Sequence, residues 1–365
     1  MAKHRFALIG CGMVGQHHIT AISGVPRAKL VAICDVRKAT ARSFGEANGV
    51  PWFTDHKAML AEVPDITIVN LCTPSGLHMK PALDVIAAGK HCVVEKPLEI
   101  ALDKCDRMID AADKAGVLLA TIFPSRFGDA AIELRKALGQ GRFGKLTMGD
   151  AYVRWWRDQA YYDSGGWRGT WKLDGGGALM NQSIHAVDLL QSYMGDVTAV
   201  TAVSGCIAHE RIEVDDATVI AIEWACGALG VIQGTTAAWP GLDKRIAISG
   251  TDGTAIMDED RLTTWEFRKP RARDAAMLAR LAAIDHGSGA SDPMAFSPEN
   301  HRRQLADFCK AIEKGGAPLV DGREGRKSVE IILAAYKSAE SGQRVTLPVL
   351  ASYRPGKKGF KSQRR

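Results

Sequence analysis

The stretch HCVVEKPLE, residues 91–99, places a lysine directly after an apolar run. Such a run is typical of a buried strand, so Lys96 would lie at the mouth of a sheet, where a solubilising role explains it poorly. Pro97 would constrain the turn, and the bond before it is a candidate for the cis form. The alternative is a surface lysine paired with Glu95 or Glu99.

The stretch GGGALMNQSIHAVD, residues 175–188, combines three glycines with a polar helix face. Asn181, His185 and Asp188 are spaced by four and three residues, so they can lie on one side of a helix. His185 suits acid–base chemistry near neutrality, and Asp188 could fix its tautomer by holding one ring nitrogen. The alternatives are a hydrogen-bonded core histidine and a helix-turn charge for Asp188. The glycines would let the backbone pass close to a substrate.

The stretch ALIGCGMVGQHH has the glycine spacing of a dinucleotide-binding turn. Gly10, Gly12 and Gly15 follow an apolar run and open a helical pattern, which allows a tight turn, a close pyrophosphate and close helix packing. Asp35 ends the next apolar run, about twenty residues further on, where a carboxylate can accept hydrogen bonds from the ribose hydroxyls. These features predict that NAD binds here.

Residues around this turn bear on the choice of cofactor. Arg37 and Lys38 could pair with the 2′-phosphate of NADP, but Asp35 would repel that phosphate, which favours NAD. The stretch NLCTPSGLH ends another apolar run, at the edge where a doubly wound sheet holds its ligand. The predicted cofactor contacts are Gly10, Gly12, Met13, Val14, Gly15, Asp35, Arg37, Cys72, Thr73, Pro74, His78, Glu95, Lys96 and Arg126.

The elements that must position these groups follow two patterns. Residues 3–123 alternate short apolar runs with helical patterns, which predicts a doubly wound parallel sheet, a Rossmann domain over 1–123. Residues 124–350 place period-two runs around tight turns, which predicts an α+β domain with an open, mostly antiparallel sheet. We expect this second domain to bind the substrate. The overall class is α/β, and residues 351–365 form a basic tail that we expect to be flexible.

Composition excludes several classes of protein. Six cations without an acid occupy the last dozen residues and account for the net charge of +6, so no nucleic-acid partner is expected. No apolar run is long enough for a membrane span or a signal peptide, so no membrane partner is expected. The eight cysteines stand singly, without CxxC spacing, which predicts a reduced, cytoplasmic protein without a metal site.

Together, GCGMVG, Asp35, TPSGLH, EKP and the glycine-led helix resemble the glucose-fructose oxidoreductase, inositol dehydrogenase and MocA family of NAD(P)-dependent sugar and cyclitol dehydrogenases. The resemblance covers residues 3–348. It implies that Lys96 and His185 flank the reacting carbinol. It also implies that the sheet of the second domain builds a homo-oligomer, which we expect to be a homodimer or homotetramer.

One position departs from the resembled pattern. The family's helix reads GGGxxxDxxxHxxD, and this chain has Asn181 at the first aspartate. An amide takes no proton, so a relay through a carboxylate there is excluded, but the amide can orient a sugar hydroxyl or His185. We expect His185 to be the base and Lys96 to donate a hydrogen bond to the developing alkoxide, with the reverse assignment left open. The predicted catalytic residues are Lys96, His185 and Asn181.

Aromatic and basic residues gather between the predicted domains, in YVRWWRDQAYYDSGGWRGTWKLDGGG. Aromatic faces stack on sugar rings, although an aromatic core cluster is the alternative. The stretch looks most like the family branch acting on UDP-N-acetylglucosaminuronate and related enzymes that oxidise hexoses or glycosides at C3. Its arginines could bind a diphosphate or a uronate. For His301 two placements stay open, one near the site and one on a helix surface. The predicted substrate contacts are Lys96, Arg157, Tyr162, Trp167, Arg168, Asn181 and His185.

These observations predict an NAD-dependent oxidoreductase, with NADP as the alternative cofactor. It would transfer a hydride between the nicotinamide and a secondary alcohol of a sugar, cyclitol, glycoside or nucleotide sugar, at C3. Two alternatives share the fold, namely a reductase of imines or tetrapyrroles and a non-catalytic NAD-binding regulator of a sugar pathway. The presence of both Lys96 and His185 argues against them.

Overall fold

The chain forms two compact units, and each is built from two stretches of sequence. The computed structural model describes residues 3–284, 290 and 297–356, so most of the predicted basic tail lies outside the described residues. Unit 1 comprises residues 1–124 and 298–326, and unit 2 comprises residues 125–297 and 327–365. All eight cysteines lie in the described ranges and are free thiols.

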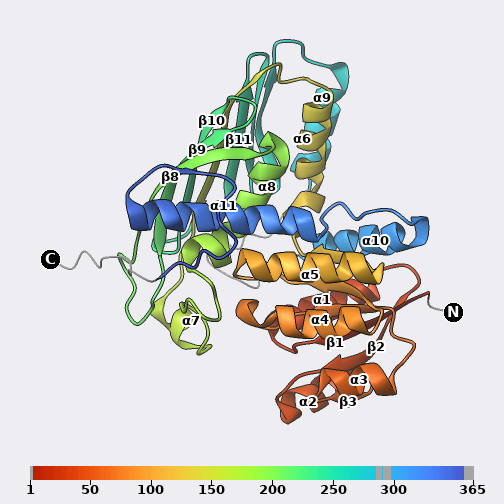
Figure 1. The fold of residues 1–365 in the computed structure, drawn as a ribbon. Helices are drawn as coiled ribbons and strands as arrows, with labels where there is room; N and C mark the ends of the chain where they lie inside the picture. Colours follow the sequence, from red (N-terminus) through yellow and green to blue (C-terminus); the bar gives the residue numbers. More distant parts are fainter. Residues whose placement is uncertain (1–2, 285–289, 291–296, 357–365) are drawn as a thin grey trace. The chain divides into compact units, whose positions relative to one another are not determined.

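Unit 1 contains the six-stranded parallel sheet that the sequence predicted (Figure 1). Its strand order is β3-β2-β1-β4-β5-β6. The order reverses between β1 and β4, where sheets of this kind bind their ligands. The central strands are buried on both faces, with Phe6, Leu8, Ile68 and Val69 fully inaccessible. The strands are β1 (His4–Ile9), β2 (Ala28–Cys34), β3 (Trp52–Phe53), β4 (Ile68–Leu71), β5 (His91–Val94) and β6 (Leu119–Thr121).

Helices connect these strands, and one further helix comes from much later in the chain. The connecting helices are α1 (Met13–Ser23), α2 (Lys38–Asn48), α3 (His56–Glu62), η1 (Ser75–Leu77), α4 (Met79–Ala87) and α5 (Leu102–Ala115). The later helix is α10 (Glu299–Lys314). Its Leu305 and Phe308 join one core with Phe6 and Ile22. The sequence assigned this helix to the second domain, because an apolar stripe does not reveal which core it covers.

Unit 2 contains an eight-stranded sheet in the order β13-β12-β11-β7-β10-β9-β8-β14. Neighbouring strands are antiparallel except β7 and β10, as predicted for an open, mostly antiparallel sheet. The strands are β7 (Leu146–Arg154), β8 (Val197–Gly205), β9 (Ala217–Trp224), β10 (Leu229–Thr235), β11 (Arg245–Gly250), β12 (Gly253–Asp258), β13 (Arg261–Phe267) and β14 (Val345–Thr346).

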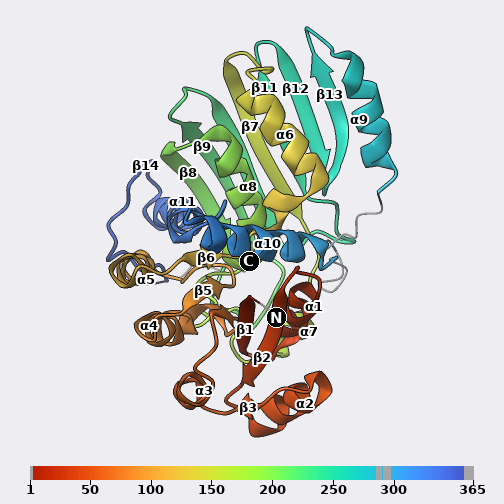
Figure 2. The ribbon, with the colours of Figure 1, turned by 90° about the vertical axis from the view of Figure 1, so that its right-hand side faces the viewer.

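Helices cover one face of this sheet, as Figure 2 shows for α6 and α8. The period-two pattern arises because alternate residues face the helices. Ile220 and Ile222 of β9 are buried, while Val219, directly before Ile220, is 47% exposed. Within the described ranges, no helix combines the length and the apolar character that a membrane span needs. The helices are η2 (Pro124–Phe127), α6 (Asp129–Gly139), α7 (Gln159–Asp163), η3 (Ala178–Ser183), α8 (Ile184–Met194), α9 (Ala272–Ala282) and α11 (Gly322–Ser341).

Candidate active site

The glycine-rich turn lies at the end of β1, beside the point where the strand order reverses. Gly10 has a φ of +97°, and a Cβ on it would meet the carbonyl carbon of Cys72 at 2.6 Å. A Cβ on Gly15 would meet the carbonyl oxygen of Gly10 at 2.5 Å. A Cβ on Gly12 would meet no described atom within 4 Å. The backbone at the start of α1 is therefore open to a phosphate group, as NAD binding requires.

Asp35 ends β2 and braces this turn from the other side. Its Oδ2 accepts a hydrogen bond from the backbone N–H of Cys11 at 2.9 Å, and its Oδ1 accepts from the backbone N–H of Arg37 at 2.9 Å. A carboxylate has about four acceptor sites, and Oδ2 keeps one of them for a ribose hydroxyl of NAD. The Nε of Arg37 also lies 3.3 Å from Oδ1, so one of the two cations that could serve a 2′-phosphate pairs with Asp35 instead.

His78 joins two loops instead of facing a ligand. The side chain is fully buried. Its Nδ1 lies 2.9 Å from the carbonyl oxygen of Pro97, and its Nε2 lies 2.8 Å from that of Thr73. Both ring nitrogens thus lie against backbone carbonyl oxygens, which supports an indirect role, and direct contact with the cofactor stays a prediction. His78 ties the loop after β4 to the turn that carries Lys96.

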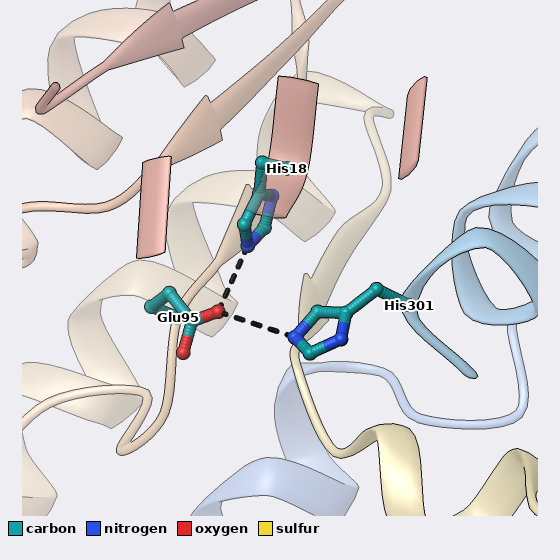
Figure 3. Close-up of side chains that lie close together, drawn as sticks. All are labelled: His18, Glu95 and His301. Carbon is teal, nitrogen blue, oxygen red and sulfur yellow. Dashed lines mark hydrogen bonds and ion pairs between the residues drawn. The ribbon is translucent and has the colours of Figure 1, made fainter. Parts of the chain in front are cut away.

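Lys96 directly follows Glu95 at the end of β5, in a turn with a cis bond to Pro97. The Glu95 side chain is buried and both of its oxygens accept hydrogen bonds. Figure 3 marks the contacts of one oxygen, with His18 and His301. Oε2 accepts from the backbone N–H of Lys96 at 3.1 Å, and Oε1 accepts from Nε2 of His18 at 2.8 Å. His18 lies on α1 and is fully buried, and its other ring nitrogen lies 2.8 Å from Nδ2 of Asn70 on β4.

His301, on α10, completes this cluster, and its Nε2 lies 3.9 Å from Oε1 of Glu95. Burial lowers the pKa of His301 to about 4, with Glu95 opposing and the histidines 17 and 18 adding to the effect. Burial alone would raise the pKa of Glu95, but His18, His301 and Lys96 outweigh it and lower that pKa to about 2. At neutral pH the cluster therefore holds a carboxylate beside a neutral His301. The sequence could not join three residues so far apart in the chain.

The same three side chains lie close enough together to be compared with a metal site. One ligand atom from each of His18, Glu95 and His301 falls within 4.8 Å of the others. Zinc holds such ligands at about 2.0–2.2 Å from itself, so neighbouring ligand atoms stand well over 3 Å apart. The separation of 2.8 Å between His18 and Glu95 is instead that of a hydrogen bond. The cluster therefore fits a hydrogen-bonded network better than a metal centre.

Two of the three glycines before the helix of unit 2, Gly176 and Gly177, are required by contacts inside the protein. A Cβ on Gly176 would meet the hydroxyl of Tyr336 at 2.3 Å, and one on Gly177 would meet the carbonyl oxygen of Asp215 at 1.8 Å. The buried Asp215 carboxylate accepts from the backbone N–H of Gly177 at 2.9 Å and from Tyr336 at 2.7 Å. Packing therefore explains these glycines without the predicted approach to substrate, and Asp215 is an anchor that the sequence analysis missed.

The helix after the glycines begins as a π-helix over η3 and continues as α8. Asn181 lies in the π-helical part and His185 in the first turn of α8, so the spacing argument for a regular α-helix does not apply to this pair. His185 is half-buried. Asp188, predicted to hold His185, is fully buried and accepts from Nε and Nη2 of Arg126, both at 2.7 Å. Asp188 and Arg126 thus form a buried ion pair.

A chain of hydrogen bonds surrounds Asn181. Its Nδ2 donates to the buried Asp174 carboxylate, and its Oδ1 accepts from Nε2 of Gln182 at 3.1 Å. Gln182 also donates to the hydroxyl of Tyr161 at 2.7 Å and accepts from Nη2 of Arg157 at 3.0 Å. A guanidinium only donates and an ionised carboxylate only accepts, so these two ends fix the orientation of both amides. The carboxylate missing at position 181 thus stands beside it, at Asp174.

The aromatic segment divides between core and surface. Tyr162 and Arg157 are 5% and 3% exposed. The Tyr162 hydroxyl lies 2.7 Å from that of Thr236, and Arg157 donates to the carbonyl oxygen of Trp156 at 2.7 Å. These groups are buried among protein partners, which supports structural roles, and their contacts with substrate stay predictions.

Trp167 and Arg168 remain partly accessible in the same segment. The Arg168 guanidinium lies over the Tyr161 ring at 4.6 Å and over the Trp167 ring at 5.2 Å. A planar cation stacked between aromatic faces keeps its edge available for an anion. These two residues therefore stay candidates for contact with substrate.

Comparison with known proteins relates both halves of the chain to one family. Residues 4–123 match a family described as an oxidoreductase family with an NAD-binding Rossmann fold, and residues 131–256 match the GFO/IDH/MocA C-terminal domain. The WlbA dehydrogenase from Bordetella pertussis, solved in complex with NADH and UDP-GlcNAcA, is 35% identical with a TM-score of 0.86. That similarity covers 95% of this chain and 99% of the other.

Two curated relatives are more distant. The myo-inositol 2-dehydrogenase of Thermotoga maritima is 29% identical over 363 residues, which cover 94% of this chain and 98% of that protein. The D-glucoside 3-dehydrogenase of Escherichia coli is 26% identical over 353 residues, which cover 94% and 97%. All three similarities run along essentially the whole chain.

Proposed function

Because this chain belongs to the GFO/IDH/MocA oxidoreductase family, we propose that it is an NAD-dependent dehydrogenase that oxidises the C3 hydroxyl of a nucleotide-linked sugar acid. The observation that carries the proposal is the similarity along nearly the full length to WlbA, whose complex contains NADH and UDP-GlcNAcA. UDP-N-acetylglucosaminuronate is accordingly the first substrate to test.

The glycine turn and Asp35 support the cofactor part of the proposal. Gly12 leaves the backbone open where the start of α1 presents free N–H groups to phosphate oxygens. Asp35 is held by Cys11 and Arg37 in a position to receive the ribose hydroxyls. When bound, NAD supplies the acceptor for the hydride that leaves the sugar carbon.

The proposal gives the proton of the hydroxyl group to His185. As the C–H bond breaks and its electron pair leaves as hydride, the O–H proton passes to the imidazole and a ketone forms. The Lys96 ammonium donates a hydrogen bond to the oxygen while negative charge develops on it. Asn181 orients a sugar hydroxyl through an amide whose direction is set by Asp174 and Gln182.

The substrate part rests on a few accessible groups. Trp167 and Arg168 offer an aromatic face and a guanidinium, which suit a sugar ring and an anion. Asn181 is neutral where the family motif carries a carboxylate, so it does not repel an acidic sugar. An anionic substrate is therefore favoured over a neutral hexose or cyclitol.

A panel assay tests the function. NAD is added with UDP-N-acetylglucosaminuronate, its uncharged parent UDP-N-acetylglucosamine, a glucoside and myo-inositol, and absorbance is followed at the reduced-nicotinamide band. The highest kcat/KM is expected with the nucleotide sugar acid. No signal with any compound would favour a regulator, and normal turnover in His185→Ala with none in Lys96→Ala would reverse the two roles.

The open face of the unit 2 sheet supports the proposal of a homo-oligomer, and the cytoplasm remains the compartment that we propose from the singly placed cysteines. Val203 is paired with Val219, and Leu229 with Met148, and these side chains are 75%, 47%, 56% and 40% exposed. An apolar patch of this kind on a sheet face is typical of an interface between protein chains. Light scattering during gel filtration is expected to give the mass of a dimer or tetramer, and a monomer would contradict this part.

A further inference from the structure

One carboxylate in unit 1 links the helix of the dinucleotide turn to the backbone of Lys96. Oε1 of Glu95 accepts from His18, which lies on α1, the helix that begins at the glycine turn. Oε2 of the same carboxylate accepts from the N–H of Lys96 at 3.1 Å. Figure 3 shows His18 and Glu95 facing each other, with His301 turned toward the same oxygen.

Burial makes this link directional. His18 and Asn70 are both fully inaccessible, and Glu95 is 7% exposed. Asn70 lies 2.8 Å from Nδ1 of His18, so the ring is held at both nitrogens and cannot turn without losing a buried hydrogen bond. A buried group that loses its partner costs about 1–3 kcal/mol. The carboxylate therefore has one favoured position, set from α1 and β4 together.

We propose that His18 is a positioning residue, which acts through Glu95 to couple the NAD-binding turn to the placement of Lys96. The inference rests on the proposed role of Lys96 at the reacting oxygen. It adds that the lysine is placed by the helix on which the dinucleotide phosphates bind. Asn70 and His301 support the same carboxylate from β4 and α10.

Two variants separate positioning from mere packing. His18→Leu keeps an apolar filler but loses the donor to Glu95, whereas His18→Gln retains an N–H group. His17→Leu is the matched control, since His17 is the neighbouring histidine on the same helix and contacts His301 only edge-on at 6.3 Å. With the full chain and the best sugar of the panel, His18→Leu is expected to lower kcat by about 10-fold to 100-fold, because small misplacements of a reacting group have effects of that size. KM for the sugar should change little, and His18→Gln should recover part of kcat.

A second readout does not depend on turnover. Trace acetylation of Lys96, quantified by mass spectrometry, reports how much of its amine is deprotonated and accessible. Glu95→Gln removes the neighbouring negative charge and is expected to raise the labelling rate by about threefold, the equivalent of half a pKa unit. His18→Leu frees the carboxylate to pair with the Lys96 ammonium, so the rate should fall. His17→Leu should leave the rate unchanged.

The outcomes distinguish the inference from the proposed function. If the wild-type chain oxidises none of the sugars, the proposed function fails, and the labelling experiment still tests the link. Equal Lys96 labelling in wild type, His18→Leu and Glu95→Gln overturns the inference. So does a stoichiometric metal ion in the purified protein that is lost in His18→Leu, because the cluster would then be a metal site. Loss of kcat in His18→Leu with the labelling shifts described supports the inference.

Discussion

The two units each bury a polar network, and the networks differ in what separates their charged groups. In unit 1 the imidazole of His18 donates directly to the carboxylate of Glu95. In unit 2 two amides, Gln182 and Asn181, stand between a guanidinium and a carboxylate. The direct contact includes a carboxylate, whose charge can change with pH. The amides stay neutral and only fix which groups donate and which accept.

This difference indicates what each network can do for the reaction. An amide has no protonation state to change near neutral pH, so the unit 2 network presents the same donors and acceptors throughout that range. The unit 1 network includes His301, whose burial lowers its pKa to about 4. Acid therefore changes the charge of a group beside Glu95 in unit 1, whereas the two amides of unit 2 keep their state.

The largest effect is expected where no group separates two buried charges. Arg126 and Asp188 are 4% and 0% exposed and form two hydrogen bonds of 2.7 Å. Arg126→Met should lower the free energy of unfolding by about 3–5 kcal/mol, because it leaves a buried carboxylate without its cation. The control Arg245→Met removes a bidentate pair whose arginine is 51% exposed, and should cost at most about 1 kcal/mol. Equal losses in urea denaturation would contradict the importance of burial here.

An exchange of side chains within the unit 2 network should have an intermediate effect. Asp174→Asn alone places an amide against the Nδ2 group of Asn181 and should cost about 1–3 kcal/mol of stability. The double variant Asp174→Asn/Asn181→Asp keeps one donor between the positions and still accepts from Gln182, so its stability should return to near wild type.

Turnover distinguishes two roles of Asn181, as a member of the hydrogen-bond network and as a neutral group facing an acidic sugar. The exchanged variant presents a carboxylate to an acidic sugar, so its kcat/KM should stay well below that of wild type although the fold is restored. Thermal unfolding and the panel assay measure the two quantities on the same sample. Wild-type turnover in the exchanged variant would show that the amide itself is not needed.

The effect that is smallest at neutral pH, and that grows only in acid, concerns the stability of unit 1. The pKa of His301 falls from 6.5 to about 4 in the folded chain. Between these pH values the unfolded chain binds more protons, so stability decreases as the pH falls, by up to about 1.4 kcal/mol per pH unit for one proton. His301→Gln removes this contribution, so its unfolding midpoint should change less between pH 6.5 and 4 than that of wild type.

The remaining acid loss serves as an internal check. The pKa of Glu95 is lowered from 4.5 to about 2, so the stability that it contributes is present above pH 4.5 and is lost toward pH 2. That loss should persist in His301→Gln. His17→Gln should follow wild type, and a His301→Gln curve parallel to wild type above pH 4 would refute the lowered pKa.

The sequence predicted what local chemistry determines. Gly10 and Gly15 were expected from the spacing of the glycine turn, and the structure supplies the contacts that require them. The bond before Pro97 is cis, as the sequence suggested. The parallel sheet and the mostly antiparallel sheet followed from the periodicity of apolar residues. These features depend on backbone conformation and strand pattern, which a short window of sequence already contains.

The partners of buried polar groups could not be predicted in the same way. Asp188 was assigned to His185, three residues away, but its partner Arg126 is 62 positions distant. Asp215 and Tyr336 meet from 121 positions apart. Arg157 and Tyr162 have the composition of a sugar site and the burial of a core. The packing of the whole unit determines which buried charges become partners, and the spacing of residues along the sequence does not reveal it.

The position of α10 late in the sequence affects how unit 1 folds during synthesis and where the chain can be truncated. Gln304 accepts from the backbone N–H of Phe123 at 3.0 Å and donates to the carbonyl oxygen of Thr121 at 2.7 Å. A fragment ending at residue 297 would contain every strand of the parallel sheet, yet its outermost strand would lack these bonds and the apolar face around Phe6 would meet water. During synthesis, unit 1 can therefore complete its hydrophobic core only after α10 has been made, although its six strands are made first.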